Sequence, residues 1–253
     1  MTDRGTQNRA PAVVTDANNP ATELWWMYPG PWGITQGDGT LSMTYSGTGT
    51  ITVTANLTNL NPAPVNAYPF VLYGCDPWND CVTPSQAPTF PMRLSQMNQL
   101  RVDTTYALSG TQFTGDITYD EYLSDTAAPN GNNELEIMVM YDFAFGHSPN
   151  CPYVKSVTEP LVINGMSTTR RFDGYFCTGG NKVTWIIEPD SYLTQGEIQI
   201  NLLDLLLQGA AIGGKTSVAY LDGIEFGTEF GNSAAQNFAF KISRFDIKQL
   251  LAP

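Results

Sequence analysis

Alternating apolar and polar residues run through most of this chain. In the segment TITVTANLTNL at 50–60, the apolar side chains of Ile51, Val53 and Leu57 alternate with threonine and asparagine. A period of two is typical of a β-strand with one buried and one solvated face. Similar runs, separated mostly by Gly, Pro, Asn or Asp turns, predict further strands. Their ranges are 40–46, 65–74, 100–108, 112–123, 134–143, 170–177, 182–188, 217–226 and 236–247.

One segment departs from this alternation. INLLDLLLQGAAIGG at 200–214 has leucines at helical spacing and a glycine-rich exit, which predicts a single helix. A sheet with one apolar face must bury that face against a second sheet. We therefore predict an all-β fold, a β-jelly-roll sandwich of two curved antiparallel sheets with one short helix and a concave cleft. We expect residues 21–253 to form a single domain, after a flexible lead-in at residues 1–20.

Composition and charge narrow the range of partners. Charged residues make up 14% of the chain, and the formal net charge is −12. This charge would repel a polyphosphate backbone, so nucleic acids and anionic membranes are unfavourable partners, whereas a neutral polymer remains compatible. No run of residues approaches the roughly 20 apolar positions of a membrane span. We expect a soluble monomer.

The cysteines indicate disulfides more than a metal site. Cys75, Cys81, Cys151 and Cys177 do not form the closely spaced pairs of a zinc site, and His147 is the only histidine. We therefore predict disulfides, an oxidising compartment and secretion, with buried free thiols as the alternative. No metal is expected. The single histidine and the absence of a GxSxG motif also disfavour Ser/His or Cys/His nucleophilic chemistry.

Two of the predicted strands carry paired glutamates away from their apolar side. In ELEIMVMYDF at 134–143, Glu134 and Glu136 alternate with apolar residues, and in DGIEFGTEF at 222–230, Glu225 and Glu229 do the same. Retaining glycoside hydrolysis typically uses two carboxyl groups about 5 to 5.5 Å apart, which neighbouring strands can supply. Solvated surface glutamates show the same alternation, so this pattern alone leaves both interpretations open.

Several blocks of the chain, in one order, resemble glycoside hydrolase family 12. LEIMVMY at 135–141 resembles the EIMIW strand of that family, and FGTEFGNSAAQNFAFKISRFDI at 226–247 resembles its closing segment with a GTEP or GFEP motif. TYDEYLSD at 118–125 resembles its YDIWL segment. The resemblance covers residues from about 22 to 247. It implies that Glu136 is the nucleophile and Glu229 the acid/base.

The same resemblance implies further roles and pairings. Asp120 would lie beside the nucleophile and hold its orientation. VNAYPFVLYGCDPWNDC at 65–81 resembles a YP strand followed by a YGC loop with a short disulfide, here Cys75 to Cys81. This pairing leaves Cys151 and Cys177 as the second pair. The mechanism requires no cofactor or metal.

Sugar binding would use aromatic rings, because the apolar C–H faces of glucose stack on them. The candidates are Trp25, Trp26, Trp32, Tyr68 and Trp78, each of which competes with a role in the core. Met138 shares a face with Glu136 and is expected under the sugar, or else as simple filler. Met140 stands where the family has the tryptophan of EIMIW, and Phe230 stands where it has a proline, so the cleft walls differ.

The resulting expectation is a secreted, retaining endo-β-1,4-glucanase that hydrolyses β-1,4-glucan chains through a covalent glycosyl-enzyme. One alternative is a hydrolase of the same fold that prefers xyloglucan or mixed-linkage glucan. Another is a non-catalytic carbohydrate-binding jelly roll, which needs aromatic rings but no paired acids. A related hydrolase acting on xylan is a third alternative, and the EIMVM and GTEF blocks argue for glucan against it.

Overall fold

The computed structural model describes most of the chain between residues 12 and 252. The described ranges are 12–16, 19–35, 37–46, 49–77, 81–82, 90–128, 134–145 and 149–252, with side chains in all of them except 12–16, 19–25 and 81–82. Within these ranges the chain forms seventeen β-strands, one α-helix and three single-turn 3-10 helices, Leu94–Gln96, Thr178–Gly180 and Pro189–Ser191. None of the helices described is long and apolar enough to cross a membrane.

Backbone pairing arranges seven strands into a first layer, here called the cleft sheet. In order of pairing they are β1 (Ala12–Asp16), β2 (Asn19–Tyr28), β5 (Phe70–Cys75), β16 (Gly223–Gly227), β9 (Asp116–Ser124), β10 (Leu135–Phe143) and β13 (Lys182–Ile187). Three short strands lie beside this layer. They are β6 (Cys81–Val82), β7 (Met92–Arg93) and β15 (Tyr220–Leu221). β6 pairs with β5, and β15 pairs with both β9 and β7.

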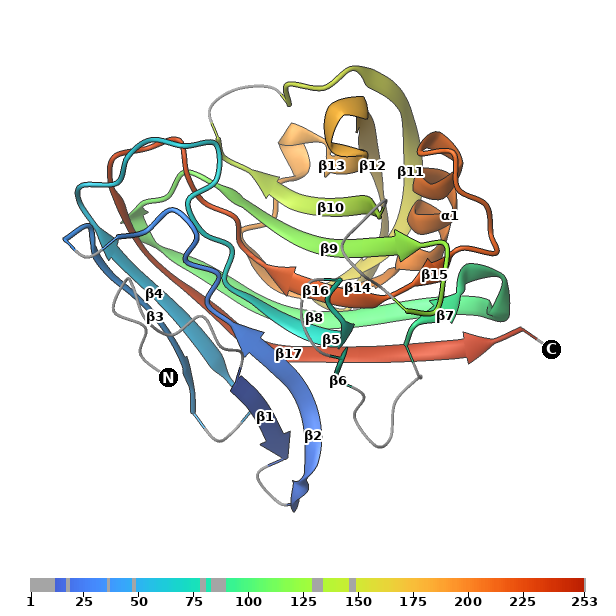
Figure 1. The fold of residues 1–253 in the computed structure, drawn as a ribbon, viewed down its shortest axis with the longest axis horizontal. Coiled ribbons are helices and arrows are strands. Elements are labelled where there is room, and N and C mark those ends of the chain that lie inside the picture. Colours follow the sequence, from blue (N-terminus) through green and yellow to red (C-terminus); the bar gives the residue numbers. More distant parts are fainter. Residues whose placement is uncertain are drawn as a thin grey trace.

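Seven longer strands form the second layer, the outer sheet. In order of pairing they are β12 (Met166–Cys177), β11 (Tyr153–Ile163), β14 (Gln195–Asn201), β8 (Met97–Gln112), β17 (Gln236–Leu251), β4 (Ile51–Leu57) and β3 (Gly39–Tyr45). Because β12 pairs with both β13 and β11, the β11–β12 hairpin joins the two sheets (Figure 1). Its turn residues Asn164 and Gly165 have φ angles of 51° and 78°, the positive values that a tight two-residue hairpin turn requires.

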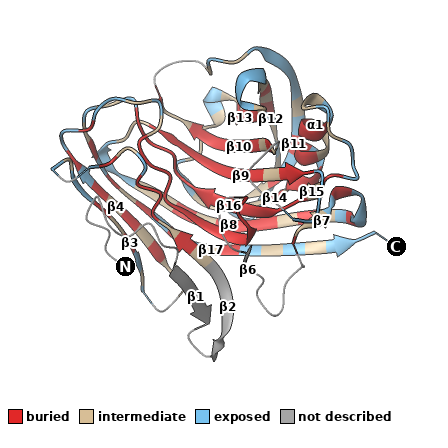
Figure 2. Cartoon of the chain, viewed as in Figure 1, coloured by how far each residue is buried: buried red, intermediate tan, exposed pale blue. Residues whose placement is uncertain are grey.

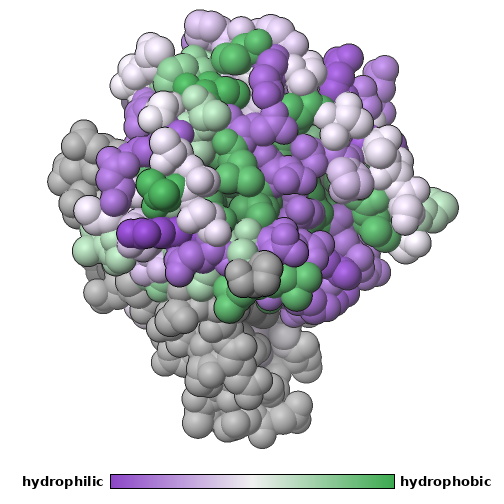
Figure 3. Space-filling view, turned by 90° about the vertical axis from the view of Figure 1, so that its right-hand side faces the viewer, coloured by the Kyte–Doolittle hydropathy of each residue, from purple (hydrophilic) through white to green (hydrophobic). Residues whose placement is uncertain are grey.

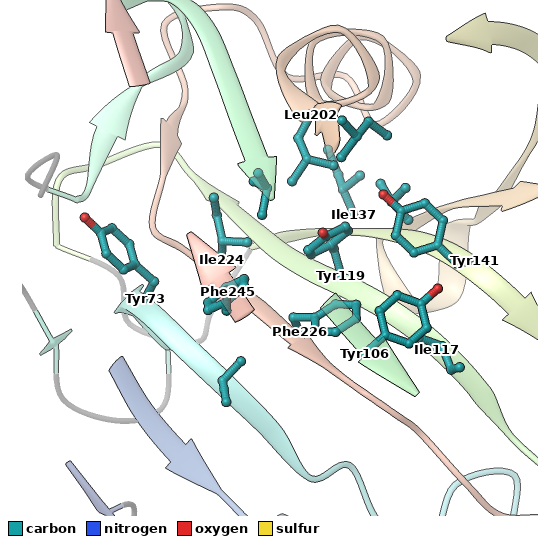
Figure 4. Close-up of a cluster of buried hydrophobic side chains, with 14 of the residues drawn as sticks. Tyr73, Tyr106, Ile117, Tyr119, Ile137, Tyr141, Leu202, Ile224, Phe226 and Phe245 are labelled. Atoms are coloured by element: carbon teal, nitrogen blue, oxygen red, sulfur yellow. The ribbon is translucent and has the colours of Figure 1, made fainter. Parts of the chain in front are cut away.

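Aromatic rings from both sheets are in contact in the core. The ring of Phe226 on β16 lies 4.8 Å from that of Tyr119 on β9 and 5.9 Å from that of Phe240 on β17, between centroids. Figure 4 shows Phe226 and Tyr119 together with Tyr106 and Phe245. The central strands of both sheets are buried (red in Figure 2), whereas polar residues surround smaller apolar groups on the face in Figure 3. Hydrophobic burial therefore fixes the side that each strand turns inward.

The predicted helix is present as α1 (Leu202–Ile212), at the right of Figure 1. The side chain of Asn201 caps it by accepting a hydrogen bond from the backbone N–H of Leu203 at 3.4 Å. It also accepts one from the backbone N–H of Leu100 on β8 at 2.9 Å, which ties the helix start to the outer sheet. The indole N–H of Trp185 on β13 donates to the carbonyl of Leu205 at 3.2 Å. The all-β sandwich with one helix is thus confirmed.

Three details differ from the expectation. β10 and β13 pair in parallel, so the cleft sheet is mixed and not wholly antiparallel. The β11–β12 hairpin intervenes between them and carries the chain back to the same end, as a parallel connection requires. The alternation does not predict β11, because most of its side chains are exposed. β1 lies within residues 1–20, the segment expected as a lead-in, and pairs with β2.

Truncation of Phe226, the aromatic residue in contact with rings from both sheets, tests the packing of the core. Phe226 is fully buried, so F226A should leave a cavity and lower the free energy of unfolding by about 3–5 kcal/mol, measured by denaturant titration. M166A is the control, because Met166 is 71% exposed and its truncation should cost less than about 0.5 kcal/mol. Equal stability of the two variants would contradict this description of the core.

Candidate active site

Strand register places a row of polar side chains on the outer face of the cleft sheet. Asp120 on β9 lies opposite Glu225 on β16 and Met138 on β10. Two residues before Met138, Glu136 lies opposite Tyr122 on β9. Directly opposed residues project from the same side of a sheet, and the intervening residues of β10 belong to the core. Because one face of the cleft sheet packs into the core, these carboxyl groups gather on its opposite face.

Two cavities on this face share Glu229. The smaller, of about 190 Å³, also contacts Lys182, Asp116 and the disulfide between Cys151 and Cys177. The larger has a volume of about 410 Å³ and combines carboxyl groups with aromatic rings. It is lined by Tyr28, Trp32, Tyr68, Phe70, Asp76, Asp120, Tyr122, Glu136, Glu225 and Glu229. This combination suits a polymer with apolar faces and a reaction that needs acids.

Glu136 has a cation beside it. Its Oε1 lies 3.5 Å from Nζ of Lys182 on β13, and the two side chains are 23% and 29% exposed. The backbone N–H of Glu136 donates to the carbonyl of Asn181 at 3.1 Å, at the start of the parallel pairing. Burial raises the pKa of Glu136, and the charge and hydrogen bond of Lys182 act against that rise. Lys182 therefore favours the ionised form of Glu136.

Glu229 lies in the connection from β16 to β17, where Asp116 holds its backbone. The N–H of Glu229 donates to Oδ1 of Asp116 at 3.2 Å, and the N–H of Asp116 donates to the carbonyl of Glu229 at 2.9 Å. Burial raises the pKa of Glu229 to about 7, with Lys182 lowering it and Glu136 raising it. Glu229 thus carries a proton under mildly acidic conditions and is suited to donate it.

Asp120 is buried in the floor of the larger cavity. The hydroxyl of Tyr122 donates to its Oδ2 at 3.1 Å, and Oδ1 has no hydrogen-bond partner within the described ranges. Burial, followed by the charges of Glu136, Glu225 and Glu229, raises the pKa of Asp120 well above its usual range. The structure thus brings Asp120 into the same cavity as both glutamates.

Three of the expected aromatic residues lie at or near the larger cavity. Tyr68 is buried and stacks on Phe70 with 4.8 Å between ring centroids. Trp32 is 49% exposed, and its ring lies 6.4 Å from that of Tyr68. Trp26 is half-buried and packs against the cluster of Tyr68, Phe70 and Leu72. Among the tryptophans whose side chains the structure describes, Trp32 is the one that lines the larger cavity and is exposed.

Other expected contact residues are placed elsewhere. Met138 is fully buried, packs with Met140 and Ile186, and lines neither cavity, so its expected place under the sugar is corrected to a packing role. Its neighbours on the same face cover it. The side chain of Trp25 and the whole of Trp78 lie outside the described residues.

The expected second disulfide, Cys151 to Cys177, is present. Cys75 is also disulfide-bonded, and the pairing of β5 with β6 places Cys81 opposite it, although the side chain of Cys81 lies outside the described set. His147 lies outside it as well. Within the described ranges, no group of three or more His, Cys, Asp or Glu side chains is arranged to hold a metal ion.

Sequence reasoning missed Lys182 and Tyr122 as members of the site. Lys182 opens a predicted strand, and alternation places it on the side opposite Val183 and Trp185. The alternation predicts only that the side chain of Lys182 points away from the core. The parallel pairing of β13 with β10, which sets Lys182 against Glu136, joins segments about 46 residues apart and has no local signature.

Comparison with known proteins assigns the chain to one family. A family model described as glycosyl hydrolase family 12 matches residues 27–248, most of the chain. A search among curated protein sequences finds no significant match.

Several solved structures share the fold. A native family 12 xyloglucanase from Bacillus licheniformis has a TM-score of 0.73 and 19% identity, with 99% of each chain covered. The endoglucanase cel12A from Rhodothermus marinus has a TM-score of 0.71 and 18% identity, covering 100% of this chain and 99% of the other. A metagenome-derived family 12 endoglucanase has a TM-score of 0.72 and 19% identity, covering 100% and 97%. Likeness at such identity shows a shared fold alone.

The buried acids make stability depend on pH. Four have folded-state pKa values above the roughly 4 of an unfolded chain, namely Asp142 (about 6), Glu159 (about 7), Glu229 (about 7) and Asp222 (about 8). The folded state binds these protons more tightly, so the stability they contribute is complete below about pH 4 and is lost as pH rises through 6 to 8. We expect the melting temperature to fall between pH 5 and pH 8.5 in calorimetry.

A matched variant checks the origin of this fall. Asp222 accepts a hydrogen bond from the hydroxyl of Ser124 at 2.5 Å, which an asparagine carbonyl can also accept. D222N should therefore keep the hydrogen bond from Ser124 and remove the titrating carboxyl group. The melting temperature of this variant should fall less at the alkaline end of the pH range. A melting temperature that rises over this interval in the unaltered protein would overturn the assignment.

Proposed function

This chain belongs to glycosyl hydrolase family 12, and we propose that it is a retaining endo-β-1,4-glucanase with Glu136 as nucleophile and Glu229 as acid/base. The observation that carries the proposal is a pair of carboxyl groups in one cavity, of which Glu136 forms an ion pair with Lys182. Glu136 has a cation at 3.5 Å that favours its ionised form, whereas burial holds the pKa of Glu229 at about 7. A nucleophile and a proton donor thus line the same cavity at mildly acidic pH.

In the first step, the carboxylate of Glu136 attacks the anomeric carbon of a β-linked glucosyl unit. Glu229 transfers its proton to the glycosidic oxygen as the bond from the anomeric carbon to that oxygen breaks. The products are a glycosyl ester on Glu136 and a departing chain with a free hydroxyl. Two acids of different proton affinity are needed here because attack and departure occur together.

In the second step, Glu229 accepts a proton from water, and the oxygen of that water attacks the anomeric carbon. Glu136 departs as a carboxylate, so two inversions restore the β configuration. The change of role follows from charge. Formation of the ester removes the negative charge of Glu136, one of the factors that raise the pKa of Glu229, so Glu229 releases its proton more readily.

Neighbouring groups complete the site in this proposal. Asp120 lines the same cavity as the two glutamates, accepts a hydrogen bond from Tyr122 at its Oδ2, and holds the orientation of Glu136. Trp32 and Tyr28 provide apolar surface for glucosyl rings in the same cavity, and the buried ring of Tyr68 lies 6.4 Å from that of Trp32. An uncharged substrate suits this cavity, because an anionic one would meet several carboxyl groups at once.

The substrate proposal rests on the aromatic cavity and on the fold shared with enzymes named endoglucanase and xyloglucanase. Disulfide bonds favour an oxidising compartment, so we place the enzyme outside the cell.

Substrate assays test the reaction class. We expect release of reducing ends from carboxymethylcellulose and mixed-linkage β-glucan, with an early drop in viscosity, because an endo-acting enzyme cuts inside chains. Xyloglucan and xylan are run in parallel. Binding to these polymers without release of reducing ends would instead support a binding module, and activity on xylan alone would contradict the β-1,4-glucan assignment.

Isosteric substitutions test the two roles. E136Q and E229Q should each lower kcat on β-glucan by about 10²–10⁴-fold, because each removes one acid from the reaction without changing side-chain size. Melting curves should show that both variants fold. E197Q is the matched control, because Glu197 lies on the outer sheet at β14 and its loss should leave kcat unchanged. Near-normal turnover in E136Q or E229Q would reject the assigned roles.

A further inference from the structure

Lys182 holds an unusual place in this site. It is the first residue of β13, and the parallel register sets it directly beside Glu136 on β10. Its Nζ lies 3.5 Å from Oε1 of Glu136. Among the described residues that line the two cavities, Lys182 is the only lysine or arginine. One cation therefore stands against a cluster of carboxyl groups.

The groups that face this cation come from every strand packed around it. Glu136 and Glu229, followed by Asp120 and Asp116, raise the pKa of Lys182 although burial acts to lower it. Further out, Tyr122 and Glu225 adjoin Asp120 and Glu136. On the other side β12 places Cys177, which is in a disulfide, opposite Lys182. The surrounding carboxylates thus favour the charged form of Lys182.

We propose that Lys182 is a positioning residue that keeps Glu136 ionised and leaves the proton of the pair on Glu229. This inference rests on the proposed function of the two glutamates. Lys182 touches Glu136 directly, so its charge stabilises the carboxylate of Glu136 more than that of Glu229. In a cavity with several acids and limited solvent, this difference decides which acid is ionised.

The same cation assists the change of role between the two steps. While Glu136 is ionised, its charge neutralises much of the field of Lys182 at Glu229. Once the ester has formed, Lys182 faces no carboxylate at position 136, and its full charge then acts on Glu229. A positive charge lowers the pKa of a carboxyl group, so Lys182 promotes loss of the proton from Glu229 when a base is required.

The test is the pH dependence of kcat/KM for K182M and K182Q with 2,4-dinitrophenyl β-cellobioside. This leaving group needs no protonation, so the acid limb reports ionisation of the nucleophile in the free enzyme. Loss of the cation should move that limb to higher pH by about one unit. With an unactivated cello-oligosaccharide, the alkaline limb of the kcat/KM profile should also move to higher pH, because Glu229 loses a neighbouring positive charge as well. K182R should restore both limbs.

Controls separate this role from a structural one. K241M removes the same charge from an exposed position on β17 of the outer sheet and should leave both limbs in place. Lower activity in K182M and K182Q with unshifted limbs would overturn the inference. E136Q and E229Q are assayed on the unactivated cello-oligosaccharide, whose departing oxygen needs the proton of Glu229. If those two lose activity while the Lys182 variants keep the original limbs, only this inference fails; if those two stay active, the proposed function fails.

Discussion

The buried side of the cleft sheet fixes the position of every acid on its other side. Successive residues of a strand point to opposite faces, so the packing of Ile137, Val139 and Tyr141 into the core forces Glu136 outward. The register of β9, β10 and β16 then aligns Asp120 and Glu225 on that face. A slip of one residue in any of these strands would put an acid in the core and an aromatic or aliphatic side chain in the cavity.

This arrangement concentrates negative charge where water is limited. An isolated carboxylate in such surroundings is costly, and proteins relieve that cost by protonation or by a nearby cation. Both solutions occur at the two cavities that share Glu229: Lys182 pairs with Glu136, while Glu229 and Asp120 have raised pKa values. The features that make the site costly for folding therefore also distribute protons in the way that acid/base chemistry needs.

Local patterns predicted a large part of this structure. Alternation in 134–143 gives the correct inward and outward sides of β10, and leucine spacing gives α1 to within about two residues at each end. The parallel pairing of β10 with β13, the exposed strand β11 and the place of Lys182 depend on contacts between distant segments, which no local period encodes. The burial of Met138 likewise depends on Ile186, a neighbour from another strand. The roles of Glu136 and Glu229 came from the resemblance of several ordered blocks, since alternation alone also fits a solvated surface.

The most direct test of the central claim is covalent trapping of the nucleophile. A 2-deoxy-2-fluoro-β-cellobiosyl fluoride forms the glycosyl ester readily, because fluoride departs without help, and the ester then hydrolyses slowly. Peptide mass spectrometry of the trapped protein should locate one 2-deoxy-2-fluorocellobiosyl group on Glu136, in the peptide containing residues 134–143. A label on Glu134, Glu225 or Asp120, or turnover of the reagent without any covalent adduct, would contradict the assignment of Glu136 and the retaining mechanism built on it.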